Sequence, residues 1–218
     1  MRKISTLQVL FFFSLLAIIL SLGFGLAYVL FGQLALGDFR GIVLLIAAIV
    51  FVYGFAFIFY RLLLKVAPLK EGEIAENSKE EFVYHVYLLF FLILFYPVMR
   101  SGFFPVPLMR LVYLALGAKL GDNTYSSGII LDPIFVEAGS NTIIGQFALL
   151  IPHVIEGTKL AHYPIKLGNN VTIGAHSVVM SNVTIEDHAI VSVGAVVTKN
   201  THIGKGEIWG GVPAKRLR

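Results

Sequence analysis

The sequence predicts a chain in two parts: transmembrane α-helices in the N-terminal half and an all-β parallel β-helix of hexapeptide repeats in the C-terminal half. Two observations predict this fold class. Apolar runs fill the first half of the chain, and two of them reach the length of about 20 residues that crosses a bilayer. In the second half an aliphatic residue returns at every sixth position, at Leu167, Ile173, Val179, Ile185, Val191, Val197 and Ile203.

The six-residue period matches neither an amphipathic helix nor an alternating strand. It is typical of a parallel β-helix, in which each hexad forms one flank and three hexads complete a coil. A small or β-branched residue stands four places after each of the first six aliphatic ones, and glycine follows several of the aliphatic residues directly, as at Gly168, Gly174 and Gly204. We therefore expect the aliphatic side chains inside the coils and the glycines at tight corners, where a Cβ would cost energy.

The composition narrows the class of protein. Of the 218 residues, 57% are hydrophobic and 14% charged, which is unusual for a soluble globule. The chain has no cysteine, which excludes disulfides, thiolate zinc sites and a cysteine nucleophile. The net charge of +4 comes from Lys and Arg near the apolar runs and at the end of the sequence. This distribution favours lipid headgroups or a phosphate-bearing ligand as partners, and no nucleic acid.

Residues 1–69 are predicted to form a helical hairpin that crosses the membrane twice. The two spanning runs are Leu7–Phe31 and Ile42–Leu64, joined by a short polar link. Basic residues precede the first run and gather at the far end of the second (Arg2, Lys3, Arg61, Lys65 and Lys70). By the positive-inside rule both flanks are cytoplasmic, so we expect a multi-pass protein of the cytoplasmic membrane whose β-helix faces the cytoplasm.

Residues 70–119 are predicted to comprise a polar linker and a helical platform. The apolar region Phe82–Val98 is followed by prolines, Arg100, Arg110 and many aromatic residues. These features favour a re-entrant or interfacial platform over a third span, and the third span stays open as the alternative. His85 lies near the start of this region, where a solvated interfacial histidine is the favoured interpretation over a functional one.

Residues 120–218 are predicted to form the β-helix and its C-terminal tail. Ser126 and Asp132 fall on interior positions of the repeat, so we expect the early hexads to be distorted. The step from Leu150 to Leu167 falls one position short of the three hexads that make a full coil. We therefore expect a loop pushed out of the coil between residues 155 and 166, and such loops often carry functional sites.

The extruded loop offers candidates for general-base chemistry. An imidazole accepts a proton near neutral pH, because its ordinary pKa is about 6.5. His153 follows a proline that restricts the backbone, and Glu156 lies three residues further on, where it could fix the tautomer of the histidine or orient an amine. We expect His153 to be the base and Glu156 its partner, with His162 as the second choice of base.

Several motifs resemble the bacterial hexapeptide-repeat acyltransferases. They are His153-x-x-Glu156-Gly157, the Leu167-Gly168 and Gly194-Ala195 segments, and the terminal Gly211-Val-Pro213-Ala214-Lys215. The relatives are the left-handed β-helix O- and N-acetyltransferases of the maltose and capsular-sugar type. The His-x-x-Glu loop is similar to the acyltransferase-like domains of polylysine-type peptide synthetases. The resemblance covers residues 120–218, and the loop is shorter and less polar than in many sugar acetyltransferases.

The resemblance implies a homotrimer that transfers an acetyl or short acyl group from acyl-CoA, with no metal. The acceptor would be a hydroxyl or amine of a small molecule or a lipid-linked compound at the membrane, and His153 would remove its proton. The backbone around Gly174, Ala175, Gly194 and Ala195 would face the pantetheine arm of the donor. The CoA phosphates would meet basic side chains (Lys199, Lys215 and Arg216).

Two other functions stay open on the sequence. The β-helix could trimerise membrane hairpins as a non-enzymatic scaffold. Alternatively, interfacial histidines could form a metal site of the carbonic-anhydrase type. His176 and His188 are separated by two hexads, which is two flanks of a three-flank coil, so they should point to different sides of one subunit.

Overall fold

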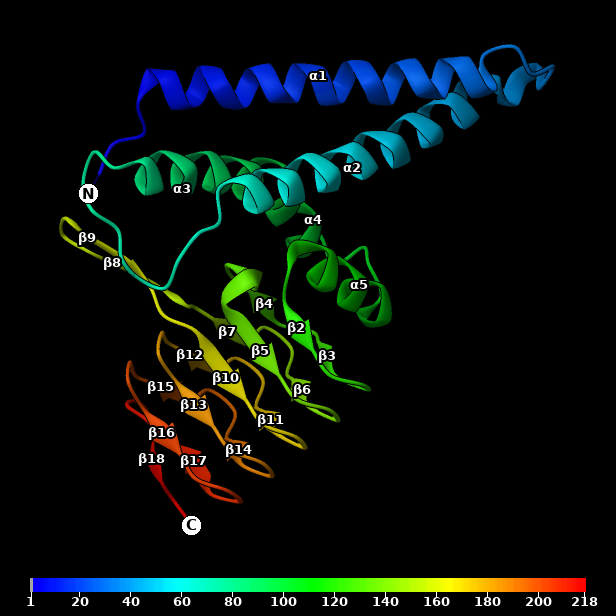
Figure 1. Ribbon diagram of the computed structural model, residues 1–218. Coiled ribbons are helices and arrows are strands. Elements are labelled where there is room, and N and C mark those ends of the chain that lie inside the picture. Colours follow the sequence, from blue (N-terminus) through cyan, green and yellow to red (C-terminus); the bar gives the residue numbers. More distant parts are fainter. Residues whose placement is uncertain (1) are drawn as a thin grey trace. The chain divides into compact units, whose positions relative to one another are not determined.

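Apolar helices form one of the two units into which the chain divides in this computed structural model, which describes residues 2–218 (Figure 1). This helical unit comprises residues 3–69 and 77–95. Its elements are α1 (Thr6–Phe31), a 3₁₀ turn (Gly37–Phe39), α2 (Arg40–Val66), α3 (Lys79–Phe90) and a π-helical segment (Phe91–Phe95).

Three helical stretches are long and apolar enough to cross a membrane: Thr6–Phe31, Gly37–Val66 and Lys79–Arg100. The predicted apolar N-terminal helices are thus confirmed. The third stretch covers the segment for which the sequence favours an interfacial platform, and by length and composition it is a candidate span like the other two. It continues from α3 through the π-helical segment into α4 (Tyr96–Arg100).

Sequence features explain how the helical unit packs. Ser5 and Gln8 form a capping box that satisfies backbone amides at the start of α1. Gly23 lets α1 approach α2 closely, because a Cβ there would lie 2.4 Å from Cγ2 of Val52. His85 is buried, with its Nδ1 3.1 Å from Oε1 of Gln8. The expectation of a solvated His85 is therefore wrong, because this side chain faces a polar partner on α1.

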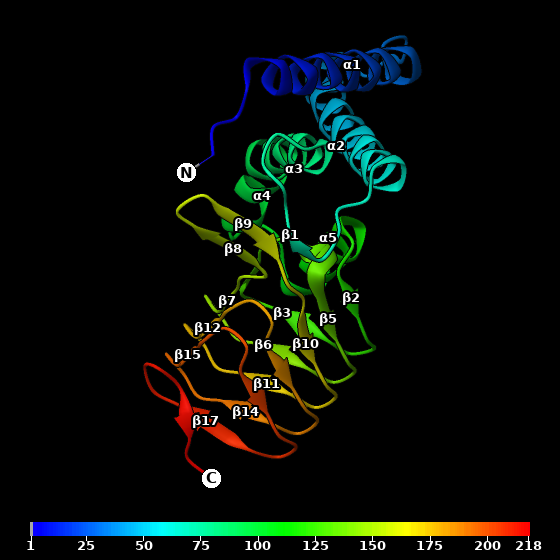
Figure 2. The same cartoon turned by 60° about the vertical axis from the view of Figure 1, so that its left-hand side comes forward.

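The second unit contains residues 70–76 and 96–218 and is built around the β-helix (Figure 2). Its first flank stacks β2 (Lys119–Leu120), β5 (Val136–Ala138), β10 (Ile165–Leu167), β13 (Thr184–Ile185) and β16 (His202–Ile203). The second stacks β3 (Tyr125–Ser126), β6 (Ile143–Ile144), β11 (Thr172–Ile173), β14 (Ile190–Val191) and β17 (Ile208–Gly210), with β18 (Lys215–Arg216) antiparallel to β17. The third stacks β4 (Ile129–Ile130), β7 (Leu149–Leu150), β12 (Val178–Val179) and β15 (Val196–Val197).

All neighbouring strands within these flanks are parallel apart from β18, and the regular partners are separated by three hexads, as for Leu167 and Ile185. The predicted parallel β-helix is confirmed. Every aliphatic residue of the six-residue series is buried, from Leu167 to Ile203. Fully burying one such side chain contributes roughly 1.5–3 kcal/mol, so the repeat itself supplies much of the stability of the domain. The chain turns at a corner after each flank. We call the turn after the first flank the first corner, the turn after the second flank the second corner, and the turn after the third flank the third corner.

Gly168 and Gly174 stand where successive coils touch. A Cβ on Gly174 would lie 2.5 Å from the backbone nitrogen of Val193 in the next coil. The left-handed conformation is adopted by asparagines and not by these glycines, for example at Asn182 (φ 58°) and Asn200 (φ 63°). The Nδ2 atom of Asn182 donates to Oδ1 of Asn200 over 2.8 Å, which continues the ladder at this corner. Close stacking, and not backbone freedom, is therefore the reason for glycine at position 174.

Helix α5 (Val106–Leu116) packs on the first coil. The hydroxyl of its Tyr113 donates to the carbonyl of Gly128 over 2.8 Å and accepts from the amide of Ile130. Arg110 donates to the carbonyl of Gly121 over 2.8 Å. An exposed coil end is a liability in repeat folds, and this helix covers it.

The strand register corrects two sequence predictions. Ile130, not Asp132, takes the interior position of the third hexad and pairs with Leu150. Asp132 instead has a φ of 44° and begins a 3₁₀ turn (Pro133–Phe135). Leu150 pairs with Val179. The separation of these two residues in sequence exceeds the usual spacing of three hexads by nearly two hexads, so the chain contains inserted residues between them. The stretch from Leu150 to Leu167 therefore advances the register by one flank; it is not a full coil that lacks one position.

Candidate active site at the extruded hairpin

The inserted residues form an antiparallel hairpin of β8 (His153–Glu156) and β9 (Lys159–His162), with His153 opposite His162. The predicted extruded segment is thus an ordered ribbon. The strand β1 (Gly72–Glu73), from the linker between α2 and α3, pairs with β9 as a third strand. Arg2 also donates its Nε–H to the carbonyl of Thr158 at the hairpin tip over 2.8 Å. The hairpin is therefore held from segments distant in sequence.

His153 and Asp132 form a close polar pair at the base of this hairpin. Nδ1 of His153 lies 2.5 Å from Oδ2 of Asp132. Strands β4 and β7 are neighbours on the third flank; Asp132 comes two residues after the first of them, and His153 three residues after the second. Asp132 is only 2% exposed, whereas the side chain of His153 keeps 23% of its surface exposed. A buried acid thus supports a histidine that solvent and ligands can reach.

The electrostatics of this pair favour a basic histidine. Burial by itself lowers the pKa of His153, but the hydrogen bond to Asp132 and the charge of that carboxylate outweigh burial and raise the pKa above its ordinary value. Because a carboxylate accepts hydrogen bonds, the pair favours the tautomer in which Nδ1 carries the proton and Nε2 has a free lone pair. Such a histidine can accept a proton at Nε2.

His162, the second choice of base, lies deeper. Its side chain is fully buried and stacks on Phe135, with ring centroids 4.5 Å apart and planes at 15°. Burial lowers the pKa of His162, with His153 contributing in the same direction and Asp132 opposing. This environment keeps His162 neutral and packed, so the geometry favours His153 as the base.

Glu156 is not directed at His153, contrary to the sequence expectation. Its carboxylate forms an ion pair with Nζ of Lys199, and this contact lowers the pKa of Glu156. Glu156 points away from His153 because both residues lie in the strand β8. Side chains three residues apart in an extended chain project to opposite faces. The partner of His153 is Asp132, which the sequence did not predict as a site residue. Its position was interpreted as a distortion of the repeat. An acidic residue on an expected interior position was the available signal.

The residues predicted to bind the donor lie at different places. Gly174, Ala175 and Gly194 lie at the second corner, where the amide of Gly194 donates to the carbonyl of Ala175 over 2.9 Å. Gly194 is open to solvent, whereas Ala195 is buried inside the coil. Lys199 follows β15 at the third corner. Lys215 is exposed on β18, and Arg216 pairs with Glu207 over 2.9 Å.

The third flank joins these parts. It begins at the second corner, with its exposed Gly194, and ends at the third corner, with the Asp132–His153 pair and Lys199. His176 and His188 lie at the second and first corners, as their spacing predicts, and so on different sides of the coil. Within residues 2–218, no three His, Asp or Glu side chains are grouped closely enough to hold a metal ion.

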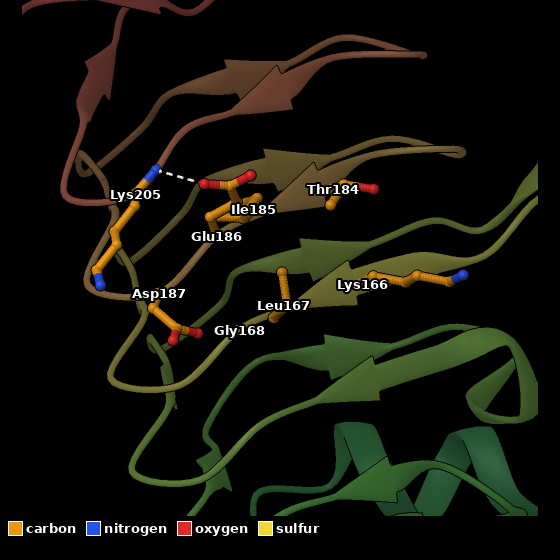
Figure 3. A pocket seen from close by; sticks show the side chains of 8 residues that line it. All are labelled: Lys166, Leu167, Gly168, Thr184, Ile185, Glu186, Asp187 and Lys205. Carbon is orange, nitrogen blue, oxygen red and sulfur yellow. Dashed lines mark hydrogen bonds between the residues drawn. The ribbon is translucent and has the colours of Figure 1, made fainter.

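A shallow pocket of about 380 Å³ lies on the first flank and contains none of the predicted site residues (Figure 3). The two carboxylates of this pocket accept hydrogen bonds from backbone amides. Oε2 of Glu186 accepts from the amide of Lys205 over 2.9 Å, and Oδ1 of Asp187 accepts from the amide of Asn169 over 2.7 Å. These hydrogen bonds connect neighbouring coils, so the role of the two carboxylates is structural.

Comparisons with known proteins show which proteins the repeat is similar to. Residues 164–199 match the family "Bacterial transferase hexapeptide (six repeats)". The chain is 31% identical to galactoside O-acetyltransferase of Escherichia coli over 49% of its length and 57% of that protein. It is 37% identical to mitochondrial gamma carbonic anhydrase 1 of Arabidopsis thaliana over 38% of the chain and 36% of that protein. It is 32% identical to delta-poly-L-ornithine synthetase of Acinetobacter baumannii over 50% of the chain and 8% of that protein.

Among solved structures, a hexapeptide-repeat acetyltransferase of Vibrio cholerae in complex with acetyl coenzyme A superposes with a TM-score of 0.43. That likeness has 23% identity and covers 47% of this chain and 60% of the other. The chain spans less than two thirds of the length of each curated relative named above. The family match lies within the coils that the strand register defines. Residues 164–199 of the β-helix are thus similar to the hexapeptide repeats of the bacterial transferases.

Proposed function

We propose that this chain is a membrane-anchored acyltransferase that moves an acetyl or short acyl group from acyl-CoA to a hydroxyl or amine. The observation that carries the proposal is the Asp132–His153 pair, placed where the hairpin leaves a hexapeptide β-helix. The similarity to galactoside O-acetyltransferase supports the transfer of an acetyl group. The apolar helical stretches support anchoring in a membrane. The basic residues that flank the first two stretches support a β-helix that faces the cytoplasm, in the arrangement in which the third stretch does not cross.

In this proposal His153 acts as general base through Nε2, because Nδ1 faces Asp132. It removes the proton of the acceptor as the acceptor oxygen or nitrogen attacks the thioester carbonyl carbon. The carbon–sulfur bond breaks, and the proton held by His153 passes to the departing thiolate. Asp132 orients the imidazole and stabilises its charged form, as the acid of a catalytic triad does.

Glu156 takes a different role from the one the sequence suggested. It pairs with Lys199 at the third corner, and Lys199 exchanges this partner for the CoA phosphates when the donor binds. The exposed backbone at Gly194 offers the pantetheine arm a close approach across the third flank. Lys215 and Arg216 lie beside the second flank and would meet the nucleotide end of the donor. The homotrimer that the resemblance implies is part of this proposal.

The test is thiol release by the purified full chain with acetyl-CoA and candidate acceptors at the membrane. His153→Ala should lower the rate by about 10²–10⁴, the usual contribution of general-base catalysis. Asp132→Asn should also lower it, whereas Glu186→Gln, a carboxylate on another flank, should not. An active His153→Ala protein with an intact fold would refute the mechanism, and an absence of CoA binding would favour the scaffold alternative.

The similarity to gamma carbonic anhydrase favours a second candidate, metal-dependent hydration. Such a site would have to be completed by histidines of neighbouring subunits. It predicts stoichiometric zinc in the purified oligomer and CO₂ hydration that a chelator abolishes. Thiol release that persists in chelator, from protein free of zinc, would decide for acyl transfer.

A further inference from the structure

A larger cavity of about 740 Å³ lies on the third flank at the first two coils. One wall is the outer face of β4 and β7, where Ile129 and Leu149 are neighbours in register while Ile130 and Leu150 point into the core. The opposite wall comes from α4, which includes Met99, and from the segment that leads from α4 to α5, which includes Phe104. The volume is typical of pockets that bind small ligands.

The lining suits an amphiphile that carries negative charge. Most lining residues are apolar, and among the described residues that line the cavity none is acidic. Arg100 supplies a positive charge, with its guanidinium carbon 5.6 Å from the centroid of the Tyr96 ring. A guanidinium binds phosphate oxygens in a bidentate manner, and the apolar wall accepts a hydrocarbon chain. An aliphatic chain with a phosphate-containing headgroup therefore matches the cavity.

The position of Arg100 in the chain points to a membrane lipid as the source. Arg100 is the last residue of the third apolar stretch, Lys79–Arg100. Cationic and aromatic residues at the end of such a stretch lie at the depth of the lipid headgroups. Phe103, three residues further on, is 82% exposed, which is typical of an aromatic side chain that enters this layer.

The cavity also lies within reach of the Asp132–His153 pair. Ile129 in the wall is three residues before Asp132, and Leu149 is four residues before His153. A fully extended chain spans at most about 3.6 Å per residue, so these Cα atoms are no further apart than roughly 11 and 14 Å. We propose that this cavity binds an anionic membrane lipid and that the lipid is, or carries, the acceptor. The acceptor role rests on the proposed function; the binding of the lipid does not.

The experiment measures lipid retention by native mass spectrometry on the full chain, released from micelles that contain phosphatidylglycerol or phosphatidylcholine of the same acyl chains. The wild type should retain one phosphatidylglycerol per subunit in a saturable manner. Ile129→Trp, which fills the cavity, should lose this adduct. Val178→Trp is the matched control, because Val178 occupies the equivalent outward position in the next coil but lies outside the cavity. Arg100→Gln should reduce the preference for phosphatidylglycerol by up to about fivefold, and Lys166→Gln should not.

Equal retention by Ile129→Trp and Val178→Trp, or equal binding of the two lipids by the wild type, would overturn the inference. A cavity closed by a neighbouring subunit would give no saturable adduct and would overturn it too. The two proposals fail separately. Saturable lipid binding without thiol release would remove only the acyltransferase. Thiol release with a water-soluble acceptor, undiminished in Ile129→Trp, together with no lipid adduct, would remove only the lipid site.

Discussion

Nδ1 of His153 lies 2.5 Å from Oδ2 of Asp132, although the two residues are far apart in sequence. The coil geometry brings them together, because β4 and β7 are adjacent and each strand is followed within three residues by one member of the pair. A carboxylate that is 2% exposed is costly unless it is paired, so this contact organises the base of the hairpin. Several expectations depend on it.

Asp132→Asn should change the pH profile of thiol release as well as its rate. The base must be neutral to act, and Asp132 raises the pKa of His153. Without the carboxylate, burial dominates and the pKa of His153 falls, so the acidic limb of kcat/KM, which reports the free enzyme, should move to lower pH. The plateau should fall as well, because an amide can stabilise the wrong tautomer. A steady-state profile between about pH 5 and 9 measures both; an unmoved acidic limb would mean that His153 is not the group that titrates.

The same contact should make stability depend on pH. A pKa raised in the folded state contributes stability that is fully present below the ordinary pKa of about 6.5 and is lost as the pH rises through the folded value. His153→Asn keeps a donor for Asp132 but cannot titrate. The unfolding midpoint of the wild type should therefore exceed that of the variant by more at pH 5.5 than at pH 8.5. His162, whose lowered pKa acts in the opposite direction, is present in both proteins. A difference that is constant with pH would contradict the linkage.

The repeat allowed the β-helix to be predicted, because the same side chains fill the core in every coil. Every residue from Leu167 to Ile203 in the six-residue series is buried as expected. The site was only half predicted. His153 stood out as a loop histidine, but its partner depends on which strands become neighbours, and that register shifts by two residues at Ile130. The prediction that Glu156 is the partner required an irregular loop. Residues 153 and 156 instead lie in one strand, which directs their side chains to opposite faces.

Lys199 and Glu156 should have opposite effects on the donor. If Lys199 contacts the CoA phosphates, Lys199→Gln should raise KM for acetyl-CoA by up to about fivefold, the range of an exposed charge pair, with kcat little changed. Glu156→Gln releases Lys199 from its present partner and should lower this KM. Both effects should shrink at high salt, because ions screen exposed charges. A Lys199→Gln protein with the KM of the wild type would remove Lys199 from the donor site.

The coil contact at Gly174 gives a test of the fold. A Cβ there meets the backbone of the next coil at 2.5 Å, whereas a Cβ on Gly204 meets only the flexible side chain of Glu207, at 3.1 Å. Gly174→Ala should therefore destabilise the protein by about 1–3 kcal/mol, the usual cost of overpacking. Gly204→Ala is the matched control and should cost much less. Urea unfolding followed by circular dichroism compares the two; equal costs would show that the coils can separate freely.

The linker strand should control the mobility of the hairpin that carries His153. The amide of Ile74 donates to the carbonyl of Leu160 over 2.9 Å, next to the pairing of β1 with β9. Ile74→Pro removes this donor, while Ile74→Val keeps it and should cost only about 0.5–1.5 kcal/mol of packing. We expect faster amide exchange at residues 159–162 in Ile74→Pro and slower thiol release, since the base loses its fixed position. Hydrogen exchange with mass detection measures the first effect. Exchange that is the same in both variants would mean that the hairpin is held by the β-helix alone.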